Sequence, residues 1–224
     1  MSMFCYQCQE TAGGQGCKIR GVCGKTEEVA KLQDLLIYTL KGISDIVTKS
    51  KTDAVSIEKV NHEVLNSLFM TITNANFDDG SIETQIKKMI ALRDELQKPA
   101  EPDCLHDAAL FNVKSRESML EKADSIGVLA TENEDVRSLR EMITYGLKGM
   151  AAYTEHANNI GKENLEINAF IYEALAATLD DSMTADDLVV LTMKTGEHGV
   201  KAMALLDEAN TTRFGTPEIT EVNI

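Results

Sequence analysis

Several residue types are scarce in this chain of 224 residues. Tryptophan is absent, proline occurs three times, and aromatic residues make up 5% of the composition. Few prolines, together with frequent Ala, Leu, Glu and Lys, favour helices. The sequence also lacks any run of about 18 apolar residues, so it predicts no transmembrane helix.

Basic residues are few as well. The chain has 22 Lys and Arg against 36 Asp and Glu, for a net charge of −14. Nucleic acid and anionic membrane surfaces would repel such a protein, so we expect neither as a partner. The N-terminal residues Met1 to Cys5 lack the basic and apolar regions of a signal peptide. These absences predict a cytoplasmic protein.

Cysteine is unevenly distributed. Four of the five cysteines fall within the first 23 residues, with the spacing C-x2-C-x8-C-x5-C, and they are Cys5, Cys8, Cys17 and Cys23. Such crowding does not suit a disulfide framework spread over the whole fold. Four thiolates are the soft ligand set that binds zinc or an iron–sulfur cluster, so the sequence predicts a metal centre.

The spacing of the cysteines indicates a metal centre more clearly than it indicates which metal is bound. Zinc usually sits between two C-x2-C pairs, whereas here a single pair is followed by a glycine-rich loop, which favours the longer wrap that an iron–sulfur cluster needs. Zinc, disulfides and inert thiols remain alternatives. Lys18 and Arg20 give the loop a positive balance that would offset the charge of a thiolate cluster, or they are simply solvated.

Other candidate ligands are weaker. A di-iron site in a helical bundle would need Glu-x-x-His pairs, and no histidine has a Glu three residues before it. We therefore interpret the four histidines as surface or hydrogen-bonded residues: His62, His106, His156 and His198. Cys104 is interpreted as a small buried residue rather than as a fifth ligand.

An internal repeat dominates the rest of the chain. Leu32–Ile43 aligns with Leu139–Met150 at an offset of 107 residues, and the apolar positions of both segments recur at steps of three and four. Each copy is followed by an Asn-x-Glu sequence at Asn61 and Asn164, an apolar helix, an acidic turn and a further helix. The pattern is typical of a duplicated three-helix unit.

The first unit predicts helices starting after Thr26, over about 56–77, and over 82–98 with Ser81 as its cap and Pro99 as its stop. In the second unit Thr184, with Asp187 three residues on, predicts a capped third helix. We thus expect an all-α fold of two tandem three-helix bundles, divided as follows: cysteine-rich loop 1–25, first bundle 26–98, connector 99–132, second bundle 133–210 and tail 211–224. In the tail, apolar Ile219 and Val222 alternate as at the start of a strand, which suggests a piece of a longer protein.

The opening Met3-Phe4-Cys5-Tyr6-Gln7-Cys8, with Gly16-Cys17, Gly21–Lys25, Leu32–Gly42 and Phe214–Ile224, resembles the hybrid cluster protein family, also called prismane proteins or hydroxylamine reductases. The resemblance covers essentially the whole chain. It implies that Cys5, Cys8, Cys17 and Cys23 hold a conventional cluster, of the [4Fe-4S] type by the x8 and x5 gaps. It also implies a helical first domain of two three-helix bundles.

The resemblance further implies an active site elsewhere. The family's hybrid iron–sulfur–oxygen cluster is held by two later α/β domains, so no residue of this chain is expected to be catalytic. Full-length relatives reduce hydroxylamine to ammonia, with a link to nitric oxide detoxification, and this domain would relay electrons from a redox donor whose identity the sequence does not specify. Alternatives are a zinc-stabilised helical interaction module and a stand-alone electron carrier. A surface prepared for the absent α/β domains predicts a tendency of this chain to self-associate.

Overall fold

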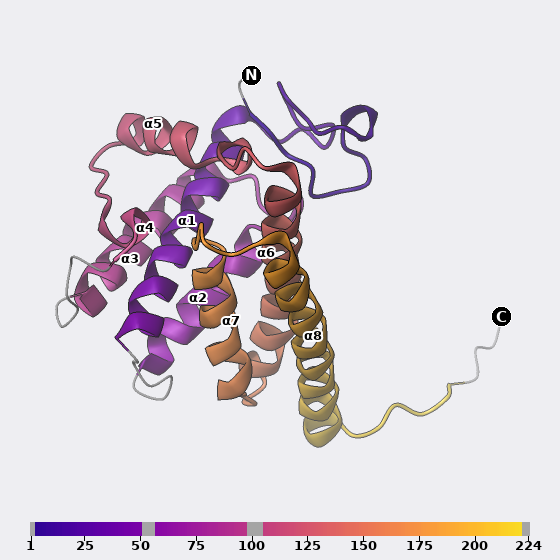
Figure 1. Ribbon diagram of the computed structural model, residues 1–224. Coiled ribbons are helices and arrows are strands. Elements are labelled where there is room, and N and C mark those ends of the chain that lie inside the picture. Colours follow the sequence, from indigo (N-terminus) through magenta and orange to yellow (C-terminus); the bar gives the residue numbers. More distant parts are fainter. Residues whose placement is uncertain (1–2, 51–56, 98–104, 221–224) are drawn as a thin grey trace.

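The computed structural model describes residues 3–50, 57–97 and 105–220 (Figure 1). Within these ranges the chain forms α-helices and short 3-10 turns and contains no strand, so the predicted all-α class is confirmed. The longer helices are α1 (Glu27–Lys49), α2 (Glu58–Met70), α3 (Asp79–Gln97), α5 (Arg116–Ile126), α6 (Glu134–Asn159), α7 (Leu165–Ala177) and α8 (Ala185–Phe214). Three short elements complete the order: η1 (Ala12–Gly14), α4 (Asp107–Leu110) and η4 (Val128–Ala130).

The predicted repeat is visible in the helix boundaries. Helices α1 and α6 begin at Glu27 and Glu134, which are 107 residues apart, and α2 and α7 begin at Glu58 and Leu165 with the same separation. The predicted cap Thr26 accepts a hydrogen bond from the N–H of Val29. Side-chain caps satisfy backbone donors that a first helical turn leaves unpaired.

Other details of the helices differ from the prediction. The second helix ends at Met70 rather than near residue 77, and a turn follows in which Thr73 has a φ of 41°. Ser81 is not a cap, because α3 already begins at Asp79 and the Asp78 carboxylate accepts the N–H of Ser81. Asn61 lies buried inside α2 instead of opening it. The capping box of Thr184 and Asp187 is confirmed.

The helices of the two units share one core. Helix α1 packs on α3, and α6 packs on α8, as expected within each unit. The middle helices, however, pack mainly across the units, α2 on α6 and α7 on α1. Between them the Tyr172 hydroxyl donates to the Asn61 side-chain oxygen at 2.8 Å. An apolar stripe can be covered by any complementary helix, and here each middle helix finds its partner in the other repeat.

The connector packs against α1, beside the N-terminal loop. Helix α4 lies so close to α1 that a Cβ built on Gly42 would come 2.0 Å from the carbonyl oxygen of Ala108. Arg93, which is 1% exposed, donates from its guanidinium to the carbonyl oxygens of Ala108 and Phe111 at 3.2 and 2.6 Å. Pro99, Pro102 and Cys104 lie outside the described residues, as does Val222.

Two further points concern the strand predicted in the tail and the search for membrane-spanning helices. Residues 215–220 form no strand in the structure, and the rest of the predicted alternation lies beyond the described part. Among the described residues, none of the helices combines the length and the apolar character that crossing a membrane requires.

Candidate metal centre

A short antiparallel bridge organises the N-terminal loop. Cys5 and Cys17 exchange two backbone hydrogen bonds, with N···O distances of 3.1 Å from Cys5 and 2.8 Å from Cys17. Gly16 precedes the bridge with a φ of +102°, and a Cβ there would lie 2.5 Å from the Phe4 ring. Only glycine fits such a position, which ties the loop tightly against its own N-terminal segment.

Two hydrogen-bonding groups lie beside the Cys17 sulfur. The Ala12 N–H donates to Sγ at 3.4 Å, and the Thr11 hydroxyl lies 3.7 Å away. The N–H of Ala12 is the largest influence on the Cys17 thiol and lowers its pKa, with smaller contributions from the Val22 backbone, Thr11 and Lys25, while burial opposes them. These donors favour the thiolate, which is the form that binds metal.

The remaining two cysteines lie on the turns that flank the bridge. The Cys8 carbonyl accepts the N–H of Thr11 at 3.2 Å, and Cys23 lies in a turn closed by Gly24 N–H to Gly21 O at 2.8 Å. Cys5 and Cys8 are partly buried, Cys17 is buried and Cys23 is exposed, and all four are free thiols. The structure therefore presents the predicted quartet from one compact loop.

The spacing of the sulfurs bears on which metal they fit. In the described part of the chain, no three of these sulfurs lie within 4.8 Å of one another. A single tetrahedral zinc ion would hold its thiolates about 3.8 Å apart, given a Zn–S bond of about 2.3 Å. A cluster of several irons holds its ligands further apart than a single ion does.

A buried lysine lies beside the loop. Lys25 is 1% exposed, and its ammonium donates to Gln33 Oε1 at 2.6 Å and to the Thr73 carbonyl at 2.8 Å. The same nitrogen is 3.9 Å from Cys5 Sγ. A buried cation at this distance stabilises negative charge on the sulfur.

The chain belongs to the Prismane/CO dehydrogenase family. The family model matches residues 3–224, which include the whole cysteine loop. Several relatives are similar to this chain. The hydroxylamine reductase of Acetivibrio thermocellus is 75% identical over 224 residues, and those of Clostridium perfringens and Desulfitobacterium hafniense are 52% and 53% identical. All of this chain is covered, but only 41% or 42% of each relative, so the chain spans less than half of their length.

Behind the loop, this family member has a polar cavity of about 50 Å³ that sequence reasoning did not predict. Two charged residues reach it from α1 and two from α6, while Cys5, Tyr6 and Lys25 line it from the N-terminal side. The four helical residues are Asp34, Lys41, Glu141 and Lys148. The hydroxyl of Tyr6 donates to Glu141 at 2.8 Å, which joins the cysteine loop to α6.

Burial perturbs the charged groups of this cavity. It raises the pKa of Asp34 to about 7, an effect that Glu141 reinforces and Lys148, Lys25 and Lys41 oppose. Burial also lowers the pKa of Lys148 to about 8, opposed by Asp34 and Glu141. The pKa of Lys41 is lowered for the same reason. Lys148 is buried and the other three charged side chains are partly buried, so both signs of charge have restricted access to water close to Cys5.

The sequence did contain a signal for this cavity. Asp34 and Glu141 occupy equivalent places in the repeat, 107 residues apart, and so do Lys41 and Lys148. In each helix the acid and the lysine are seven residues apart, on one face. Equivalent charges on a helix face that is otherwise apolar indicate that the two copies meet there.

The histidines lie apart from the cysteine loop. His106 caps α4 by accepting the N–H of Ala108 at 3.0 Å. His156 contacts the Phe69 ring edge to face, and His198 stacks on Phe170 with ring centroids 3.8 Å apart. His62 belongs to a separate group with two glutamates.

Proposed function

We propose that this chain is the N-terminal iron–sulfur domain of a hydroxylamine reductase and that it relays electrons. The observation that carries the proposal is the cysteine loop, in which two free cysteines form a backbone bridge, two more lie on the adjoining turns, and the Ala12 N–H donates to Cys17 Sγ. Cys5, Cys8, Cys17 and Cys23 would hold the cofactor, a [4Fe-4S] cluster, which takes up and releases single electrons when bound.

The residues around the loop have a definite task in this function. Four thiolates concentrate negative charge, and each added electron increases it. Lys25 lies 3.9 Å from Cys5 Sγ, and the Ala12 N–H and Thr11 hydroxyl face Cys17 Sγ. Such donors and charges stabilise the more negative state, so these residues would raise the reduction potential.

We assign electron relay to this chain and catalysis to further domains, because the chain is shorter than its relatives. The relatives named hydroxylamine reductase are more than twice as long as this chain, which supports further domains in the same polypeptide. We place the hybrid iron–sulfur–oxygen cluster, the reduction of hydroxylamine to ammonia and any nitric oxide detoxification in the complete enzyme, in its α/β domains. The chain described here would then contain no catalytic residue and would accept electrons from a cytoplasmic redox donor.

Iron, acid-labile sulfide and zinc analysis of the anaerobically purified protein tests this function. We expect about four irons and four sulfides per chain, with a brown protein that bleaches when reduced. Serine at Cys17 should remove most of the iron, because this buried ligand lies at the bridge, whereas serine at the exposed Cys23 should leave a more labile cluster. One zinc per chain without sulfide would contradict the proposal and favour a helical interaction module.

A further inference from the structure

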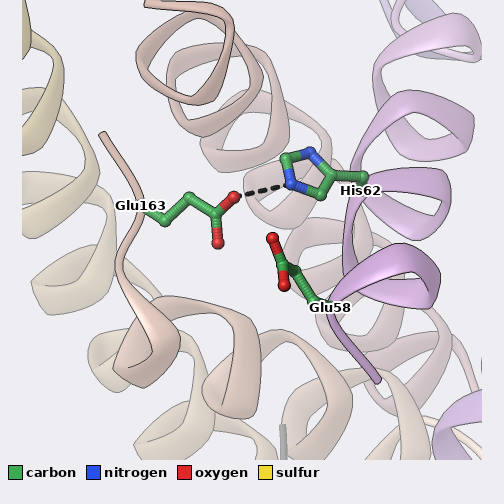
Figure 2. A group of neighbouring side chains, drawn as sticks. All are labelled: Glu58, His62 and Glu163. Atoms are coloured by element: carbon green, nitrogen blue, oxygen red, sulfur yellow. Dashed lines mark hydrogen bonds and ion pairs between the residues drawn. The ribbon is translucent and has the colours of Figure 1, made fainter. Parts of the chain in front are cut away.

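Three side chains converge on the side of the molecule where α2 meets the segment between α6 and α7. Glu58 and His62 lie one turn apart on α2, and Glu163 precedes α7 (Figure 2). The potential ligand atoms of all three lie within 4.8 Å of one another. His62 Nε2 and Glu163 Oε1 are already 2.6 Å apart. The i, i+4 spacing on a helix places Glu58 and His62 on the same face, where both can reach one ion.

The charges of this group are not balanced by protein partners. Within the described residues, Glu58 forms no hydrogen bond or ion pair, although its carboxylate points toward His62 and Glu163 in Figure 2. Two carboxylates that face each other repel, and one imidazole offsets at most one of them. A bound cation would remove that repulsion.

A second observation nearby points the same way. Glu155 on α6 is close enough to His62 for the two charges to interact, and its Oε2 is buried without a hydrogen-bond partner among the described residues. A buried carboxylate oxygen without a partner needs an explanation in a native structure. A cation held by the three neighbouring side chains would offset the cost of leaving this oxygen unpaired.

We propose that Glu58, His62 and Glu163 bind one divalent first-row transition metal ion, with zinc as the reference ion. One imidazole nitrogen and two carboxylate oxygens are a ligand set that such ions accept, whereas calcium requires six or more oxygens. Ligand atoms around one such ion lie roughly 3 Å apart, so small side-chain rotations from the present positions suffice. Three protein ligands leave at least one position for water.

Binding at this place would tether the two repeats. Glu58 and His62 belong to the first unit, and Glu163 belongs to the second. Helix α2 of the first unit packs mainly on α6 of the second unit. An ion here would therefore link α2 to the segment that follows α6. A ligand that binds only the folded state raises stability in proportion to the logarithm of its concentration. The site is separate from the cysteine loop and does not depend on the cluster.

Manganese(II) binding followed by electron paramagnetic resonance tests the site. The signal of free Mn²⁺ falls when the ion binds, and Mn²⁺ prefers oxygen and nitrogen ligands, so cysteine thiols compete little. The titration uses the cluster-bearing chain in excess Mg²⁺, which occupies ordinary surface carboxylates. We expect one Mn²⁺ per chain, and the variant Glu58→Gln should bind at least about tenfold more weakly while keeping the His62–Glu163 ion pair.

Glu134→Gln is the matched control, since it removes one exposed carboxylate from the first turn of another helix. It should bind Mn²⁺ as the parent chain does. His62→Gln should bind as weakly as Glu58→Gln or more weakly, and zinc should raise the thermal unfolding temperature of the parent chain but not of Glu58→Gln. Equal binding by the parent chain and Glu58→Gln, or no uptake up to about 1 mM Mn²⁺, overturns the proposal and leaves an ion pair only.

Discussion

At the scale of single residues, the cavity behind the cysteine loop shows what burial does to charge. Asp34 lines this cavity and has a pKa raised to about 7, above the ordinary value of 3.8. The folded protein therefore binds a proton at Asp34 more tightly than the unfolded chain does between these values. Such a group contributes stability at low pH, and the contribution is lost as the pH rises toward 7.

Replacing Asp34 by Asn should remove this pH dependence. The free energy of unfolding of the parent chain should fall relative to that of Asp34→Asn as the pH rises from about 4 to about 7, because the parent must then carry a charged carboxylate with restricted access to water. Urea unfolding followed by circular dichroism at several pH values measures the difference. Asp207→Asn, at an exposed position on α8, is the control and should track the parent chain. Parallel curves for Asp34→Asn and the parent would show that Asp34 is solvated.

At the scale of elements, one glycine determines how closely the connector approaches α1. Gly42→Ala would place a methyl group against the Ala108 carbonyl, where only 2.0 Å is available. Backbone must move to admit it, and such overpacking typically costs about 1–3 kcal/mol. Chemical denaturation should therefore show a lower free energy of unfolding for Gly42→Ala.

The repeat itself supplies the control for this substitution. Gly149 is the equivalent residue of α6, and a Cβ there meets no atom within 4 Å. Gly149→Ala should raise stability by up to about 1 kcal/mol, because alanine is the better helix former. A similar loss in both variants would mean that helix α4 does not press on α1 in solution.

The helices themselves were largely predictable, and the errors have local causes. The caps Thr26 and Thr184 and the repeat offset were correct because a cap involves residues only three apart in the chain. Ser81 was wrongly taken as the start of α3, since Asp78 lies three residues earlier and satisfies the same first turn. Both residue types can cap, and the sequence alone did not rank them.

At the scale of the whole molecule, an apolar groove runs between α6 and α8. Its lining includes four glycines, which leave room, and the exposed side chains of Met142, Tyr153 and Met203. Met142 and Met203 are 59% and 48% exposed. Isolated proteins rarely leave such a surface uncovered, and in the proposed complete enzyme the further domains are candidates to cover it.

In the isolated chain we expect this surface to cause self-association. Light scattering at increasing concentration should show a rising mean mass for the parent chain. Met142→Lys should reduce that rise, because a charged side chain in the groove would have to be buried at the contact. Ile219→Lys is the control, since Ile219 is fully exposed in the tail and outside the groove. A monomer at all concentrations, or equal association of both variants, contradicts this expectation.

The sequence by itself determined the helical class, the repeat and the crowding of four cysteines in one loop, because each depends on residues near one another in the chain. Only the tertiary structure decided that α2 and α7 pack on each other's units and that Asp34 and Glu141 share a cavity. The same holds for Glu163, which comes from a different element than Glu58 and His62. An apolar stripe in the sequence predicts that one face of a helix is buried. Which neighbouring helix buries it depends on how all of the helices pack together in space.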